Sequence, residues 1–370
     1  MREVELLLNE PLPSYRTPRL RVLANGQLVT GAYASEITSN NHYSADHFST
    51  VVALGADPYA NADFWSSESD ILIDIQLSLS GDTGFVSLLQ GYVDTVSINP
   101  SGEVAHISGR DFTAALIEAR TQEAFSNRTS SEIATIFASR HSLTPHVIQT
   151  YTPVGRFYQS DYEILTLSRF SKATTEWDFL VSLARHENYD VFVNGTNLYF
   201  QPSTGISSID KVVYPTDLIE LTLERALTLS RGIQVTVQSW NSLKQNSLTE
   251  CVASTVSGDS SGSSGTSTRP NQQYVAIRPN LTPDKALAMA RQCISEVSRH
   301  ERVIELTMPG DLVLTPRSVI ALDGTRTDFD QAYYIDSIER TFRPKTGFVQ
   351  HIRAYNSSPR TETVLTSTVS

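Results

Sequence analysis

The chain has 370 residues, of which 40% are hydrophobic, and carries a formal net charge of −11 at pH 7. This acidic balance, without any basic cluster, excludes a sequence-independent grip on DNA or RNA, which needs Lys and Arg to displace counterions from phosphates. No apolar stretch reaches 18 residues, so no membrane span is expected. Glu3 and Glu5 interrupt a very short N-terminal apolar run, which argues against a signal peptide and for synthesis in a cytoplasm.

Residues 1–118 are predicted to form an N-terminal arm, over 1–18, and a first tube-like β-barrel domain. The clearest strand covers 71–79, where five apolar residues share one face and Asp74, Gln76 and Ser78 share the other. This period of two is typical of a half-buried antiparallel strand. Further strands are expected at 19–24, 33–40, 47–54, 85–98 and 103–109, with turns at 80–84 and 99–102. A short helix opened by Asp111 follows.

Residues 119–208 are predicted to be a small α/β domain with helices and a β-hairpin. Residues 129–132 (Thr-Ser-Ser-Glu) form a capping box before an apolar stripe. A second helix is expected to start at Thr175, with Asp178 as its cap partner. Asn194-Gly195 then separates two β-rich runs within 189–200, which is the strongest short hairpin signal because both central residues must tolerate positive φ.

Residues 209–356 are predicted to form a second tube-like β domain, and residues 357–370 a Ser/Thr-rich C-terminal tail. Strands are expected at 219–223 and 233–237, and a flexible Ser/Gly-rich loop at 254–272. A helix over 283–300 starts with Thr282 as N-cap and Pro283 at its first position. The predicted fold class is mixed and mainly β (α+β). It comprises two related antiparallel β-barrel tube domains, an intervening α/β domain, and a helix in or beside the second barrel.

A weak self-similarity recurs across about 245 residues. Residues 92–96 and 102–107 (YVDTV, then GEVAHI) match residues 334–338 and 347–352 (YIDSI, then GFVQHI). Both copies read as strand, turn, strand, with a turn three residues longer in the second. A chance match in a β-rich chain is the alternative to a duplicated domain. Two similar barrels per chain would, in a trimer, place six round one axis, so that a threefold object could dock on a sixfold one.

No residue pattern supports a catalytic, cofactor-binding or metal site, and none is predicted. Residues 258–262 match GxSxG around Ser260, but in a Ser/Gly run such matches arise from composition alone. The two cysteines, Cys251 and Cys293, make no metal-ligand spacing. The histidines lack the spacing of a helical zinc pair, and we expect packed or hydrogen-bonded roles for them; they are His42, His47, His106, His141, His146, His186, His300 and His351. The carboxylates fit turn, cap or strand-surface roles: Asp74, Asp94, Asp178, Asp311, Asp323 and Asp336.

Three stretches together resemble the baseplate hub proteins of contractile-tailed phages, the family that includes the phage late control D proteins. They are residues 102–116 (GEVAHISGRDFTAAL), residues 175–185 leading through Asn194-Gly195 to 198–202, and residues 308–312 with 321–324, 334–338 and 347–348. Their order and spacing across roughly 20–355 carry the resemblance, since each piece alone is weakly specific. The Ser/Gly insertion at 254–272 departs from the family's pattern.

The resemblance implies a structural protein of the virion, assembled in the host cytoplasm, and not an enzyme. A homotrimer would form a pseudo-six-fold ring between the hexameric tail tube and the trimeric central spike. Other expected partners are further baseplate proteins and the tape measure protein, with DNA only passing through the channel and no membrane insertion by this chain. Type VI secretion spike proteins append a β-helical needle to this hub, and we expect the spike here to be a separate chain. The alternatives are a tail-associated peptidoglycan hydrolase, which needs paired carboxylates or a Ser/His pair in a cleft, and the hub of a phage-derived injection particle or gene transfer agent.

Overall fold

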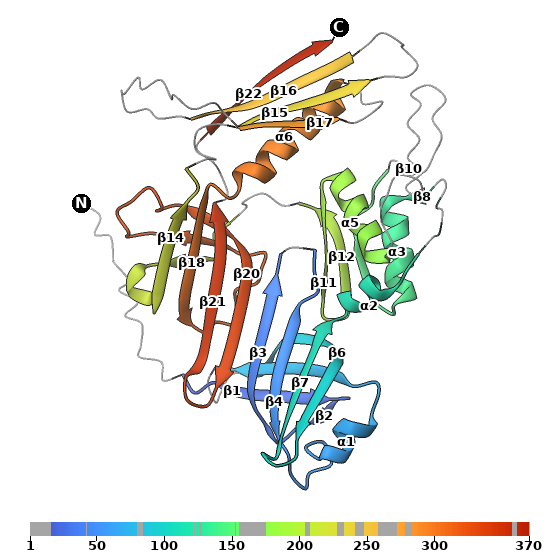
Figure 1. Ribbon diagram of the computed structural model, residues 1–370, viewed down its shortest axis with the longest axis vertical. Coiled ribbons are helices and arrows are strands. Elements are labelled where there is room, and N and C mark those ends of the chain that lie inside the picture. Colours follow the sequence, from blue (N-terminus) through green and yellow to red (C-terminus); the bar gives the residue numbers. More distant parts are fainter. Residues whose placement is uncertain are drawn as a thin grey trace, which may run out of the picture. The chain divides into compact units, whose positions relative to one another are not determined.

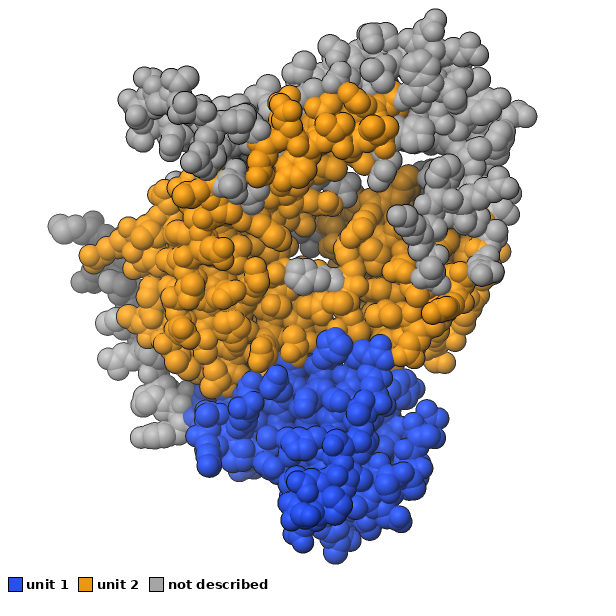
Figure 2. Space-filling model, in the orientation of Figure 1, with its two compact units in different colours: residues 1–37, 47–110, 341–348 blue, residues 38–46, 111–340, 349–370 orange. Residues whose placement is uncertain are grey.

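A computed structural model describes residues 16–41, 43–79, 84–121, 123, 125, 128–151, 153–154, 175–203, 208–227, 233–240, 248–257, 272–277, 283–356 and 361–369. The fold is mainly β with antiparallel sheets and few helices, which confirms the predicted fold class (Figure 1). Two compact units divide the chain (Figure 2). Unit 1 holds residues 1–37, 47–110 and 341–348, and unit 2 holds residues 38–46, 111–340 and 349–370. The predicted arm lies mostly outside the described residues.

Unit 1 is built on a sheet whose strands follow the order β3-β4-β7-β6-β5-β1-β2. The elements are β1 (Arg19–Ala24), β2 (Gln27–Leu28), β3 (Ala32–Asn40), β4 (His47–Ala53), α1 (Ala62–Ser67), β5 (Leu72–Ser78), β6 (Val86–Asn99) and β7 (Val104–Asp111). The strand predicted at 71–79 and the five other strands predicted in this domain are all present, and their ends differ from the predicted ends by at most two residues. Ile73, Ile75 and Leu77 are buried on one face of β5, as the alternation predicts.

The close approach of neighbouring strands in unit 1 depends on Gly109 in β7. A Cβ atom added at Gly109 would lie 2.0 Å from the carbonyl oxygen of Tyr92 and 2.7 Å from the ring of Phe48. Backbone and a buried aromatic ring leave no room to relax, so only glycine fits. Gly55, by contrast, has nothing within 4 Å of such a Cβ.

The second β module follows the strand order β14-β18-β21-β20-β19-β13. Its elements are β13 (Lys211–Val213), the 3-10 helix η1 (Pro215–Asp217), β14 (Glu220–Arg225), β18 (Arg302–Pro309), β19 (Val319–Leu322), β20 (Ala332–Arg343) and β21 (Gly347–Asn356). Tyr333, Ile335, Ile338 and Ile352 are fully buried in its core. The strand predicted at 219–223 is confirmed as β14.

The two modules share their strand order and the register of the repeated residues. Strands β3, β4, β7, β6, β5 and β1 correspond in order to β14, β18, β21, β20, β19 and β13. Tyr92 pairs with Leu72 in β5, and its counterpart Tyr334 pairs with Val319 in β19. His106 lies opposite β4, and His351 lies opposite β18. A duplicated module explains both registers, whereas a chance sequence match explains neither.

Two details differ between the modules. β1 runs antiparallel to β5, whereas β13 runs parallel to β19. The prediction of a longer turn in the second copy is wrong: residues 100–103 join β6 to β7, and only residues 344–346 join β20 to β21. Two of the three extra residues extend β20, because five strand residues follow the matched segment there and three follow it in β6.

The first insertion, between β7 and β13, is an α/β fold. It contains α2 (Thr113–Glu118), β8 (Arg128–Thr129), α3 (Ser130–Arg140), β9 (Thr144–Val147), β10 (Pro153–Val154), α5 (Glu176–Glu187), β11 (Tyr189–Asn194) and β12 (Asn197–Pro202). β11, β12 and β9 form one sheet, with β9 parallel to β12. Helices α3 and α5 bury Phe137, Leu180 and Leu183 with Phe200 of this sheet.

The predicted helix starts are confirmed: Thr129 and Glu132 form the capping box of α3, and Thr175 accepts the backbone N–H of Asp178 at the start of α5. The prediction that Asp111 opens α2 is one residue off, since Asp111 ends β7 and Phe112 precedes the helix. The hairpin is confirmed, but its turn is Gly195-Thr196. Only glycine takes a positive φ there, +54°, since Asn194 still belongs to β11.

The second insertion, between β14 and β18, is a four-stranded sheet covered by a helix (Figure 1). It contains β15 (Ile233–Trp240), β16 (Leu248–Ser257), β17 (Gln272–Ile277) and α6 (Pro283–Ser298), and is completed by β22 (Thr361–Val369) in the order β17-β15-β16-β22. The predicted loop at 254–272 is too long, because β16 runs to Ser257 and β17 starts at Gln272; residues 258–271 lie outside the described part. The predicted tail contains β22, whose Thr and Val residues favour a strand.

Candidate functional site

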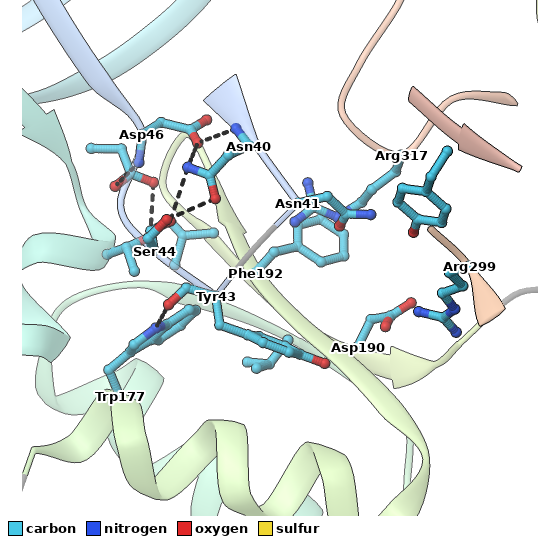
Figure 3. Close-up of a pocket in the computed structure, with 15 residues that line it drawn as sticks. Asn40, Asn41, Tyr43, Ser44, Asp46, Trp177, Asp190, Phe192, Arg299 and Arg317 are labelled. Atoms are coloured by element: carbon cyan, nitrogen blue, oxygen red, sulfur yellow. Dashed lines mark hydrogen bonds between the residues drawn. The ribbon is translucent and has the colours of Figure 1, made fainter. Parts of the chain in front are cut away.

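A small polar pocket of about 100 Å³ lies within unit 2 (Figure 3). Its walls come from the β3–β4 connection, the end of β7, α5, β11, and the segments that precede β18 and β19. The lining residues are Asn40, Asn41, Tyr43, Ser44, Asp46, Asp111, Thr113, Trp177, Asp190, Val191, Phe192, Val193, Arg299, Arg317 and Tyr355. Three carboxylates and two guanidinium groups therefore meet round a space equal to a few water molecules.

The β3–β4 connection is fixed on one side of this pocket by hydrogen bonds. The indole Nε1 of Trp177 donates to the Tyr43 carbonyl at 2.7 Å. The backbone N–H and side-chain amide of Asn40 donate to Asp46 Oδ1 at 2.9 and 3.2 Å, and Ser44 Oγ donates to the Asn40 side-chain oxygen at 2.8 Å. This network holds the Asp46 carboxylate at one place and engages the Ser44 hydroxyl as a donor to Asn40.

Asp111 is a buried carboxyl group beside Asp46. It is 9% exposed; one oxygen accepts the Asp46 N–H at 3.2 Å and the other accepts the Thr113 hydroxyl at 2.8 Å. Burial, followed by the nearby charge of Asp46, raises the pKa of Asp111 to about 7. Asp111 is consequently protonated at acidic pH and gains its negative charge near neutrality.

A row of stacked side chains leads away from the pocket across the α/β sheet. The guanidinium carbon of Arg317 lies 3.4 Å from the centre of the Phe192 ring. Phe192 stacks on Tyr199 at 4.8 Å, and Tyr199 stacks on His146 at 4.9 Å. These three rings occupy paired positions on β11, β12 and β9. Desolvation lowers the pKa of Arg317 to about 10 although the residue as a whole stays exposed, so its charge persists at neutral pH.

This arrangement suits residues that hold neighbouring segments of unit 2 together better than it suits a catalytic centre. Substrate pockets typically enclose 300–1,000 Å³, several times the space here. None of the described histidines lines the pocket. The carboxylates are committed to backbone and side-chain donors of their own chain, and Arg317 joins the segment before β19 to the α/β sheet through the Phe192 ring.

The histidines considered from sequence occupy separate places. His141, after α3, lies 2.6 Å from Glu176 on α5, a carboxylate that is 2% exposed and also paired with Arg140. His351 Nδ1 is 3.2 Å from Thr307 Oγ1, and the His300 ring is 5.5 Å from that of Tyr355. Three others are exposed on β4, β7 and α5: His47, His106 and His186. His42 lies outside the described residues, as does Ser260.

The aspartates considered from sequence make contacts through their side chains or, for Asp178 and Asp323, through their backbone N–H groups. Asp94 and Arg110 form a two-pronged ion pair at 2.6 and 2.9 Å. Asp74 accepts from Ser87 at 2.6 Å and from Gln90 at 3.3 Å. The remaining contacts are Asp311 with Lys211, Asp336 with Arg353 at 3.9 Å, and the Asp323 N–H with the Val213 carbonyl. Within the described part of the chain, no three His, Cys, Asp or Glu side chains cluster as a metal would require.

Sequence reasoning missed the Asp46–Asp111 pair and the Arg317 stack. Asp111 carried the signal of a helix start, and Asp46 and Arg317 carried no signal, because their partners are 65 and 125 positions away along the chain. Cys293 lies on α6, partly buried against its sheet, and Cys251 lies in β16. No helix among the described residues is long and apolar enough to cross a membrane.

A family model described as the Alg8 N-terminal domain matches residues 59–343 of the chain. The chain belongs to this family. The match begins just before α1 and ends with the last residue of β20, so it includes the first insertion, β15 to α6 of the second, β5 to β7 of the first module and all of the second module except β21. The family's description names neither a tail nor a hub. No curated protein matches the chain.

Solved structures of tail proteins share the fold over nearly the whole chain. The tail protein from Neisseria meningitidis MC58 is 12% identical with a TM-score of 0.67, covering 92% of this chain and 96% of that one. The 43 kDa tail protein of prophage MuSo2 from Shewanella oneidensis is 14% identical with a TM-score of 0.65, covering 91% and 98%. The E. coli c3393 protein is 11% identical with a TM-score of 0.51, covering 93% and 78%; it is described as a type VI secretion component similar to the T4 tail proteins gp27 and gp5.

Proposed function

We propose that the chain is the structural hub of a contractile phage tail baseplate. Three copies form a pseudo-six-fold ring that joins the hexameric tail tube to the trimeric central spike and lines the DNA exit channel. The observation that carries the proposal is the duplicated six-strand order, with its shared registers at Tyr92 and Tyr334 and at His106 and His351. The fold shared with tail proteins supports the same assignment at the level of architecture.

Duplication gives this chain the geometry that a symmetry adaptor needs. A hexameric tube ends in six equal surfaces, and a trimeric spike presents three. A subunit with two similar modules contributes two sixfold-like positions, and its differing insertions contribute one threefold position each. The work of such a ring is mechanical: it closes the tube before injection and holds the spike until host contact.

Unit 1 presents apolar side chains that suit assembly with further copies. Leu72 and Tyr92 are directly paired across β5 and β6 and are 36% and 46% exposed. Three more large apolar residues of the same unit are exposed: Leu28, Tyr33 and Val86. Obligate interfaces bury on the order of 2,000–5,000 Å² and are rich in such residues. Exposed apolar residues of this kind support the proposed assembly of the chain with further copies, with other baseplate proteins and with the tape measure protein.

The acidic balance of the chain suits a channel through which DNA passes. With a net charge of −11, each chain carries more carboxylates than cations, so exiting DNA would meet a wall to which it does not adhere. A ring whose channel is lined mainly by Lys and Arg would contradict this part of the proposal.

Copy number tests the proposal directly. The full chain, alone and mixed with the tail tube protein of the same particle, is measured by analytical ultracentrifugation and native mass spectrometry. We expect three chains per assembly, formed at the latest when the tube protein is present. A chain that stays monomeric in both samples, or that assembles in a number other than three, contradicts the hub.

A further inference from the structure

The four-stranded sheet of the second insertion ends in two strands that nothing in their sequences protects from further pairing. Its order is β17-β15-β16-β22, so β17 and β22 each have one neighbour among the described strands (Figure 1). β17 (QQYVAI) contains no charged residue, proline or glycine, and β22 (TETVLTSTV) contains one charged residue, Glu362. Natural proteins normally blunt such edges, because their backbone N–H and C=O groups recruit another strand.

The strands that end the other described sheets are blunted in the usual ways. β9 carries Pro145, which has no N–H to offer, and β11 carries Asp190. β14 carries three charged residues, Glu220, Glu224 and Arg225. β2, β8 and β10 are two residues long and β13 three, too short to hold a further strand. The two open edges therefore belong to one and the same sheet.

β17 also exposes apolar side chains along its edge. Val275 and Ile277 are 62% and 69% exposed, whereas Ala276 between them packs against the core under α6. The register places Val275 beside Thr236 and Ile277 beside Gln238, both half-buried polar residues of β15. The exposed apolar strip is thus confined to the edge strand, and a partner that covers it must approach from beyond the edge.

The directions of the strands select the kind of pairing. β17 runs parallel to β15, β15 runs antiparallel to β16, and β16 runs antiparallel to β22. β17 and β22 therefore run in the same direction, and a second sheet placed beside the first would bring β22 against β17 as a parallel pair. Pairing of β17 with β17 of another copy would need a twofold axis, which a threefold ring does not have.

The charge of the chain favours a contact between these edges. Each copy carries a net charge of −11, so two copies repel each other where acidic surfaces meet. β17 and β22 bring a single charged residue, Glu362, to a common junction. Contact at this place therefore avoids most of the repulsion between copies.

We infer that β17 of one copy pairs with β22 of the next copy, so that the sheets of three chains continue into one another. Each chain would use one edge on either side, which is the head-to-tail contact that a closed ring requires. Main-chain hydrogen bonds would supply affinity, and the Thr- and Val-rich β22 would cover Val275 and Ile277. This inference rests on the proposed three-copy hub and assigns a surface through which its copies join.

Disulfide crosslinking between copies tests the inference. Val275→Cys is co-expressed with a second full-length chain in which cysteine replaces one of residues 362–368, each in turn, because neighbouring strands place Cα atoms within disulfide range. Assemblies purified alone or with the tail tube protein are oxidised and run on a non-reducing denaturing gel. At least one mixture should give a two-chain band, and the chain with both substitutions should give a three-chain band. The unaltered chain, with Cys251 and Cys293, shows the background.

A charge placed on the edge provides a second measurement. Val275→Lys should weaken three-copy assembly in analytical ultracentrifugation by at least about tenfold, because the junction would bury an unpaired ammonium group. Thr144→Lys is the matched control, since Thr144 is exposed on β9, whose edge Pro145 already blocks. It should leave assembly unchanged, and equal effects of the two substitutions would overturn the inference.

Failure of the inference and failure of the hub are distinguishable. If three-copy assemblies form but no β22 position crosslinks to Val275→Cys, or if Val275→Cys crosslinks to itself, the inference is overturned and the hub function stands. If no three-copy assembly of the unaltered chain forms in either sample, the hub function fails and the inference fails with it. Because Val275 is exposed, its variants should unfold at the same temperature as the unaltered chain when all are monomeric.

Discussion

Replacing Asp111 with asparagine should remove a pH-dependent weakness of the fold. In the folded chain the pKa of Asp111 is about 7, against 3.8 for an ordinary aspartate, because burial and the Asp46 charge disfavour the carboxylate. The folded state therefore holds this proton more tightly than the unfolded state. The resulting stabilisation is fully present below about pH 4 and is lost as the pH rises through 7.

The magnitude follows from the shift. A difference of about three pKa units, at about 1.4 kcal/mol each, gives a stabilisation of about 4 kcal/mol at low pH. Between pH 5 and pH 8 the linkage relation removes about 2.5 kcal/mol of it. Asparagine keeps an oxygen for the Asp46 N–H, and the Thr113 hydroxyl can rotate to accept from the new amide, so the Asp111→Asn chain should escape this loss.

The assay is urea unfolding followed by circular dichroism at pH 5, 6, 7 and 8. The difference in unfolding free energy between D111N and the unaltered chain should move in favour of D111N by about 2.5 kcal/mol from pH 5 to pH 8. Asp94→Asn, which alters an exposed ion pair in unit 1, is the control and should show no such trend. Parallel pH profiles for D111N and the unaltered chain would refute the reasoning.

Three further changes probe packing and stacking. Gly109→Ala should lower the unfolding free energy by about 2–3 kcal/mol through overpacking, while Gly55→Ala should stay within about 0.5 kcal/mol; equal effects would contradict the close approach at β7. Arg317→Lys, which cannot stack flat on Phe192, should cost about 0.5–2 kcal/mol by thermal unfolding, and a neutral result would deny the stack a role. Leu180→Ala should cost about 2–5 kcal/mol, and a smaller loss would mean that the α/β core closes over the cavity.

Local signals in the sequence predicted the elements that depend on neighbours along the chain. The capping box at Thr129 and the cap at Thr175 require residues three positions apart, and the structure has both. The alternation in β5 requires only a half-buried sheet position. The repeat could also be read from sequence, because equal positions in two modules face equal packing demands.

Features that depend on distant partners could not be predicted in this way. β22 is mostly polar and follows no periodic apolar pattern. It nevertheless pairs over nine residues with β16, which lies more than 100 positions earlier in the chain. The turn of the β11–β12 hairpin shifted by one position because cross-strand pairing, and not the Asn-Gly signal, fixes which residues stay extended. Asp46 meets Asp111 only once β4 and β7 are paired.

The rotational symmetry of the assembled ring tests the central claim most directly. Electron cryomicroscopy of the chain in its particle, averaged without imposed symmetry, should show a threefold ring containing six similar β modules, two from each chain. A ring with three β modules and three unrelated lobes, or one whose subunit number is not three, would contradict the account.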